Sequence, residues 1–140
     1  MIVVDSSVAA KWFLEEPGTL EAEALQEHGD SIAPDLIIPE VLNTIWKNVR
    51  LKRIVPAQMK LVAAALPSHL AWIVSTRILA GRAAEIAVEL DHPVYDCFYI
   101  ALAEREGCTL VSADQRLQRK IRRTKFAKIV KPLLHAPRAT

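Results

Sequence analysis

Short apolar runs alternate with longer helical patterns along this chain, and this alternation restricts the fold more than any other feature. The run Ile2-Val3-Val4 is typical of a short buried strand that ends at Asp5, whereas residues 36–52 and 93–106 carry patterns typical of helices. Strands that alternate with helices are joined by right-handed crossovers, which places the strands parallel and covers both faces of the sheet. The sequence therefore predicts an α/β fold, a single domain with a parallel central sheet of four or five strands flanked by helices.

The expected element boundaries follow from apolar periodicity and from the positions of proline and glycine. Asp35 is expected to cap a helix over residues 36–52, and Pro39 must lie near its first turn to be tolerated. In such sheets ligands gather beyond the carboxyl ends of the strands, where the strand order reverses. The segments expected as strands are 2–4, 31–33, 70–74, 109–111 and 128–130. The segments expected as helices are 8–14, 20–28, 36–52, 56–66, 80–90 and 93–106.

The length of 140 residues suits one compact domain, which we place at residues 1–132 with a C-terminal tail at 133–140. No apolar run reaches the ~18 residues that span a bilayer, and the first residues lack the basic start of a signal peptide. Cys97 and Cys108 lack metal-binding spacing and are expected as buried thiols in a reducing compartment. These features predict a cytoplasmic protein without a membrane segment.

Residues 36–66 hold more apolar side chains than one small core is expected to cover. We expect them to form the interface of a homodimer, and the alternative is that all of them belong to the core. Trp12, Trp46 and Trp72 stand among apolar residues and are expected in the core rather than as platforms for nucleic-acid bases. The apolar side chains of the expected interface are Leu42, Ile45, Trp46, Val49, Leu61, Val62 and Leu66.

The formal charge of +2 is unevenly distributed along the chain. Residues 115–140 contain nine basic and no acidic residues. The other nine basic residues are set against all 16 acidic ones, so residues 1–114 carry a formal charge of −7. Such a chain could hold cations in one place and phosphates in another, and the alternative is an ordinary solvated helix face.

Four acidic residues occupy positions that point to chemistry. Asp5 and Asp114 follow expected strands, although either could simply cap the next helix. Asp96 stands in a helix that is apolar on nearly every face, and Glu40 is surrounded by apolar residues in the same way. A buried carboxylate is costly unless a cation or metal pairs with it, although a place in the first helical turn is a structural alternative for both.

Several carboxylates in one cleft repel one another unless cations lie between them. Oxygen ligands without a histidine or cysteine group suit Mg²⁺ or Mn²⁺ rather than Zn²⁺. Such ions can activate water and stabilise the leaving oxygen of a phosphodiester. The four histidines share no metal-ligand spacing and are interpreted as structural or surface residues. No nucleophile–base set for covalent catalysis is present, so hydrolysis by metal-activated water is the expected reaction.

Four segments, in order and over almost the whole chain, resemble the motifs of the PIN domain, and more closely those of the VapC toxins of bacterial toxin–antitoxin pairs. The segments are residues 3–9, 33–43, 94–103 and 110–114. The resemblance implies Mg²⁺- or Mn²⁺-dependent cleavage of RNA, a homodimer, and a cognate antitoxin that blocks the cleft. It implies that the metal-binding and catalytic residues are Asp5, Glu40, Asp96 and Asp114, with Ser7 as a small polar residue near the metal.

The basic segment is expected to hold the RNA backbone beside the acidic cleft. If residues 116–128 are helical, Arg116, Lys120 and Arg123 share one face and would contact phosphates. Docking of an acidic antitoxin is the alternative. Two other functions remain open: a receiver-like signalling domain, suggested by Lys131-Pro132 after a late strand, and a non-catalytic RNA-binding module.

Overall fold

The computed structural model describes residues 1–133, and five parallel strands form its central sheet. The predicted α/β fold is confirmed, with the strand order β3-β2-β1-β4-β5. The last strand begins two residues later than expected, because a 3₁₀ turn capped by the Thr124 side chain occupies Lys125–Lys128. The strands are β1 Ile2–Val4, β2 Ser31–Pro34, β3 Trp72–Val74, β4 Thr109–Ser112 and β5 Val130–Pro132.

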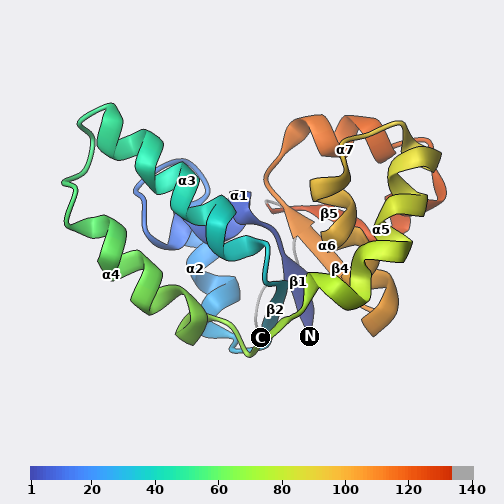
Figure 1. The fold of residues 1–140 in the computed structure, drawn as a ribbon, viewed down its shortest axis with the longest axis horizontal. Helices are drawn as coiled ribbons and strands as arrows, with labels where there is room; N and C mark the ends of the chain where they lie inside the picture. The colour runs from blue at the N-terminus through green and yellow to red at the C-terminus, as the bar shows by residue number, and fades with distance from the viewer. Residues whose placement is uncertain (134–140) are drawn as a thin grey trace.

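The helices form two layers that enclose the sheet, with α2, α3 and α4 on one side and α5, α6 and α7 on the other (Figure 1). No helix of residues 1–133 is long and apolar enough to cross a membrane. The α-helices are α1 Ser6–Ala9, α2 Thr19–Glu27, α3 Ile37–Arg50, α4 Gln58–Ala65, α5 Thr76–Leu90, α6 Val94–Glu106 and α7 Gln115–Ile121. The 3₁₀ helices are η1 Ala10–Trp12, η2 Leu66–His69 and η3 Lys125–Lys128.

Helix α6 is the centre of the core. It packs against α5 and across β1, β2 and β4, and the run from Tyr99 to Ala103 is buried on every face of the helix. The helix ends, as its sequence predicts, at Gly107, whose positive φ of 63° suits glycine. Because α6 crosses the middle of the sheet, a polar residue in its first turn is brought close to the ends of the central strands.

Two expectations about individual side chains of the fold, one cap and two tryptophans, are wrong. Asp35 does not cap α3; its side chain accepts a hydrogen bond from the backbone N–H of Thr76, at the start of α5. Trp46 and Trp72 are each 46% exposed rather than in the core. The buried residues of α3 recur every fourth position and Trp46 lies one residue beyond this stripe, whereas Trp72 belongs to an edge strand with a neighbour on one side only.

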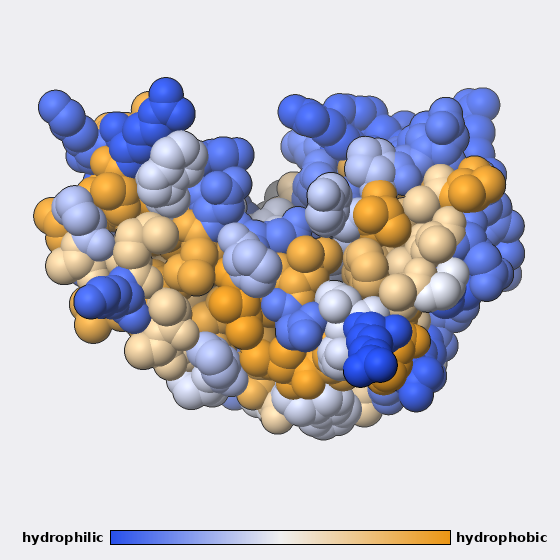
Figure 2. Space-filling view, viewed as in Figure 1, coloured by the Kyte–Doolittle hydropathy of each residue, from blue (hydrophilic) through white to orange (hydrophobic). Residues whose placement is uncertain are grey.

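The strand order places the switch point between β1 and β4, because the chain proceeds outward in opposite directions from these two strands. A receiver-type sheet has the order 2-1-3-4-5, so the strand order excludes the receiver interpretation. Figure 2 shows that the surface is deeply hollowed between the two helical layers and that hydrophilic side chains gather on both rims. In the matching view of Figure 1 this hollow lies beside α1, which directly follows β1.

Candidate acidic active site

Asp5 lies at the carboxyl end of β1, where its backbone and its side chain both form hydrogen bonds. Its backbone N–H donates to the carbonyl oxygen of Val111 in β4, 3.4 Å away. Its side chain caps α1 by accepting from the N–H of Val8 at 3.2 Å and from the hydroxyl of Ser7 at 2.5 Å. The residue is only 3% exposed. The capping role is therefore real, and it fixes a buried carboxylate at the switch point of the sheet.

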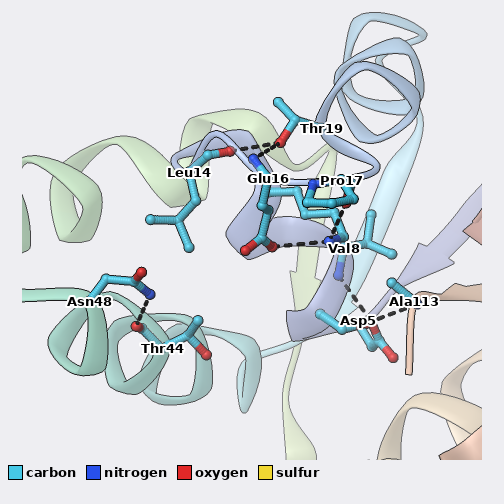
Figure 3. A network of polar contacts seen from close by, with 11 residues as sticks. Asp5, Val8, Leu14, Glu16, Pro17, Thr19, Thr44, Asn48 and Ala113 are labelled. Atoms are coloured by element: carbon cyan, nitrogen blue, oxygen red, sulfur yellow. Dashed lines mark hydrogen bonds and ion pairs between the residues drawn. The ribbon is translucent and has the colours of Figure 1, made fainter. Parts of the chain in front are cut away.

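Two serine hydroxyls connect this carboxylate to the end of β4. The Ser7 oxygen accepts a hydrogen bond from the N–H of Ala113 at 2.9 Å, so it bridges Asp5 and the chain after β4. Figure 3 shows Asp5 and Ala113, the two residues that it joins. Ser112 is fully buried, and its oxygen accepts from the N–H of Asp114 at 3.0 Å. The sequence analysis missed Ser112, although a polar residue directly after an apolar strand run was a usable signal.

The environment of Asp5 opposes its ionisation. Burial raises the pKa of its carboxyl to about 6, while hydrogen bonds from Ser112, Ser7 and Val8 lower it in part. The negative charge of Asp96 raises the pKa further. Asp96 therefore lies close enough to Asp5 for the two charges to interact.

Glu40 is part of the same electrostatic group. It lies in the first turn of α3, half-buried, and Tyr99 donates a hydrogen bond from its hydroxyl to Oε1 at 2.5 Å. Burial raises the pKa of the Glu40 carboxyl, the Tyr99 hydroxyl lowers it, and Asp96 raises it again. Asp96 is thus a common neighbour of Asp5 and Glu40, which are separated by 35 positions in the sequence.

Asp96 itself is held by a histidine. The Nε2 atom of His92 lies 2.6 Å from Oδ2 of Asp96, across the start of α6. His92 was interpreted from the sequence as a structural or surface residue, but its ring contacts a carboxylate of the site. Tyr99, also missed, follows Asp96 by three positions and so lies on the same side of α6. The first turns of α6 therefore supply Asp96 and Tyr99, and His92, which precedes the helix, supplies a second group that orients an acid.

Asp114 behaves differently from the other three acids. It caps α7, and its Oδ1 accepts from the N–H of Arg116 at 2.8 Å. Its charge is not among the causes of the pKa shifts of Asp5 and Glu40. The structure brings it to the carboxyl edge beside β1 but shows only the capping role, so its role as a ligand stays a prediction.

The donor set of Asp5, Glu40 and Asp96 suits a hydrated magnesium ion better than a closed metal cage. Among residues 1–133, no three histidine, cysteine or acidic side chains are already grouped as a metal site. Mg²⁺ keeps several of its waters and is commonly held by one or two carboxylates. Among the causes of the pKa shifts of Asp5 and Glu40 there is no basic side chain, so no protein cation compensates these two carboxylates, whereas Asp96 has His92 as its partner.

The basic segment forms a shorter helix than the sequence suggested. Helix α7 ends at Ile121, so Arg123 lies beyond it and the expected helical face of three cations is wrong. Arg116 and Lys120 are on α7 and exposed. Arg138, with most of the expected tail at 133–140, lies outside the described residues. Cys97 and Cys108 are both free thiols; Cys97 is buried, as expected, whereas Cys108 is half-buried.

The parallel sheet and the acids at its carboxyl edge define an α/β protein with an acidic site, and comparison with known proteins specifies the family. Residues 2–123 match the PIN domain, and the chain belongs to this family. It is 29% identical over 127 residues to Ribonuclease VapC3 of Pyrobaculum aerophilum, which covers 85% of this chain and 93% of the relative. It shares its fold with the crystal structure of PAE2754 from the same organism, with a TM-score of 0.70, 23% identity, and coverage of 95% of this chain and 90% of the other.

The Tyr99–Glu40 contact leads to a first prediction. We expect Tyr99→Phe to lower the free energy of unfolding by about 1–2 kcal/mol, because Glu40 loses a hydrogen bond that favours its charged form. Urea unfolding at neutral pH measures this. Tyr95→Phe is the matched control, since Tyr95 lies on the same helix and is 59% exposed. Equal midpoints for the two variants would contradict the assigned role of the hydroxyl.

Proposed function

We propose that this protein is a divalent-metal-dependent ribonuclease and the toxin of a toxin–antitoxin pair. One observation carries the proposal: Asp5 is fixed at the carboxyl end of β1, and Tyr99, one turn after Asp96 on α6, donates a hydrogen bond to Glu40, so three carboxylates gather at the carboxyl edge. A relative named as a ribonuclease supports the same activity. A purely RNA-binding module would gain nothing from such a cluster, because its negative charge repels the RNA backbone.

Asp5 and Asp96 are the residues proposed to hold the ion, with Mg²⁺ or Mn²⁺ as the metal, and Glu40 and Asp114 are proposed to complete the site. When bound, the ion supplies an activated water and stabilises the leaving oxygen of a phosphodiester. Ser7 and Ser112 keep the Asp5 carboxylate oriented, and Tyr99 and His92 do the same for Glu40 and Asp96. The chain's own contribution is thus a set of carboxylates fixed before the ion arrives.

Metal removal tests the activity. We expect the purified protein to cleave single-stranded RNA with Mg²⁺, to lose cleavage in EDTA, and to regain it with excess Mg²⁺, because uncompensated carboxylates alone repel the phosphate. Gel analysis of a labelled RNA measures the products. Cleavage that persists in EDTA would mean that the reaction does not need a divalent ion.

We also propose a cytoplasmic location and an antitoxin as partner.

We propose a homodimer as well. Of the seven apolar residues expected at the interface, Ile45, Val62 and Leu66 are core, while Trp46 and Leu61 are exposed. Leu51 and Val55 lie exposed in the same region, each at 60%. An exposed apolar surface of this kind suits a protein interface. We expect light scattering at micromolar concentration to give twice the mass of the chain, and the mass of one chain would remove the dimer proposal.

A further inference from the structure

A second hollow follows α7 away from the acidic site. It has a volume of about 500 Å³ and lies between α7 and β5. Gln115, Gln118 and Arg119 line this hollow from one face of α7, because they recur at i, i+3 and i+4. Arg122, the C-cap residue of α7, keeps a helical backbone conformation and lines the hollow as well. Lys131 of β5 lines the opposite wall. We call this feature the α7–β5 groove, with Arg119, Arg122 and Lys131 as its cations.

The groove is continuous with the carboxyl edge of the sheet. A neighbouring cavity of about 320 Å³ is lined by Ser112 and Ala113, which adjoin Asp5 through the Ser7 bridge. The two cavities share Gln115, Gln118 and Pro132. The four acids line neither cavity, but Gln115, which directly follows Asp114, lines both. A chain lying in them would pass over the start of α7, beside the carboxyl edge, to the three cations.

The charge along this path changes sign. No basic side chain is among the causes of the pKa shifts of Asp5 and Glu40, whereas residues 115–133 contain no acid. Within residues 1–133, Lys125 is the one basic residue of this segment that pairs with an acid, through Glu89 at 3.0 Å. Arg119, Arg122 and Lys131 are exposed and form no such pair there. Their charges are available to a ligand, and arginine presents a planar fork that matches phosphate.

We infer that the α7–β5 groove binds the backbone phosphates of the RNA strand whose cleaved bond lies at the acidic site. This inference rests on the proposed ribonuclease function. It replaces the face of Arg116, Lys120 and Arg123 predicted from the sequence, because helix α7 ends before Arg123 and none of these three residues lines the groove. The contacts give affinity without sequence choice, since phosphates are the same at every nucleotide.

The test compares two triple variants with the same loss of charge. The first is Arg119→Gln, Arg122→Gln, Lys131→Gln; the second is Arg116→Gln, Lys120→Gln, Arg123→Gln. Binding of a fluorescent single-stranded RNA is measured by anisotropy in EDTA over a series of salt concentrations, so that cleavage plays no part. We expect the first variant to lose about tenfold or more in RNA affinity at low salt. The slope of log affinity against log salt should become shallower by about 2, because each of the three lost phosphate contacts contributes about 0.7 to it. The second variant should lose clearly less.

Three results would overturn the inference. The first is an equal loss of RNA affinity in the two triple variants, and the second is an unchanged RNA affinity of the first variant. The third is a loss of polyaspartate affinity in the first variant as large as its loss of RNA affinity, which would indicate an acidic protein as occupant. Arg119→Lys with Arg122→Lys keeps the charges and should keep most of the affinity, which separates loss of contact from loss of folding. Because binding is measured without metal, failure of the groove and failure of the nuclease activity are distinguishable.

Discussion

Asp5→Asn is expected to abolish RNA cleavage while making the metal-free protein more stable. The carboxylate is 3% exposed and lies within the field of Asp96, so its charge is costly in the absence of a cation. Asparagine keeps an oxygen that can accept from Ser7 and from the N–H of Val8. We expect cleavage to fall by more than about a hundredfold, beyond the 10–100-fold typical of losing an outer-shell partner. Unfolding in urea with EDTA should show that the free energy of unfolding of Asp5→Asn exceeds that of the wild type by about 1–2 kcal/mol at a pH of about 8.

The control for this variant is Asp91→Asn. Asp91 is exposed at the end of α5 and has a φ of 50°, a backbone conformation that asparagine tolerates well. The Asp91→Asn variant removes one negative charge, as Asp5→Asn does, but at an exposed position near the start of α6 and outside the group of Asp5, Glu40 and Asp96. Cleavage and stability close to those of the wild type are expected. If Asp5→Asn cleaved RNA as fast as this control, the acidic group would not be the active site.

Stability and activity are expected to depend on pH in opposite directions. The pKa of the Asp5 carboxyl is raised from 3.8 to about 6, mainly by burial, so the folded chain binds more protons than the unfolded chain between these values. The free energy of unfolding therefore falls by about 3 kcal/mol for this group as pH rises through this window, and it is constant at higher pH. Metal binding needs the ionised carboxylate, so cleavage at limiting Mg²⁺ should rise with pH through about 6.

The quantity to measure is the difference in unfolding free energy between the wild type and Asp5→Asn, in EDTA, across this pH range. The difference removes the contribution of other groups, such as Glu104, whose pKa is lowered by its hydrogen bond with Arg82. The pH profile of cleavage is recorded at a Mg²⁺ concentration below saturation. A difference that stays constant with pH would contradict the elevated pKa of Asp5.

The sequence predicted those features of the site that depend on local context. Asp5 follows an apolar run, and Asp96 stands in a helix without a polar face, so each is recognisable without knowing its neighbours. The parallel sheet follows from the alternation of elements, and the carboxyl edge follows from the parallel sheet. The convergence of Asp5, Glu40 and Asp96 is therefore largely contained in the order of strands and helices.

The partners of the acids could not be predicted in the same way. The hydrogen bond between Tyr99 and Glu40 joins residues 59 positions apart, and Ser7 reaches the N–H of Ala113 across 106 positions. Such contacts depend on how α3, α6 and β4 are placed in space. The end of α7 was also missed, because a run of basic residues continues past Ile121 without a glycine or proline to mark the boundary.

A titration of Mn²⁺ into the wild type, Asp96→Asn and Asp91→Asn, followed by electron paramagnetic resonance, measures directly whether the acids of the carboxyl edge hold a divalent ion. Asp96 interacts with both Asp5 and Glu40, so its neutralisation should weaken any ion held between them. We expect the wild type and Asp91→Asn to bind Mn²⁺ alike, and Asp96→Asn to bind at least about tenfold more weakly. Equal binding by all three proteins would contradict a metal site at the carboxyl edge of the sheet.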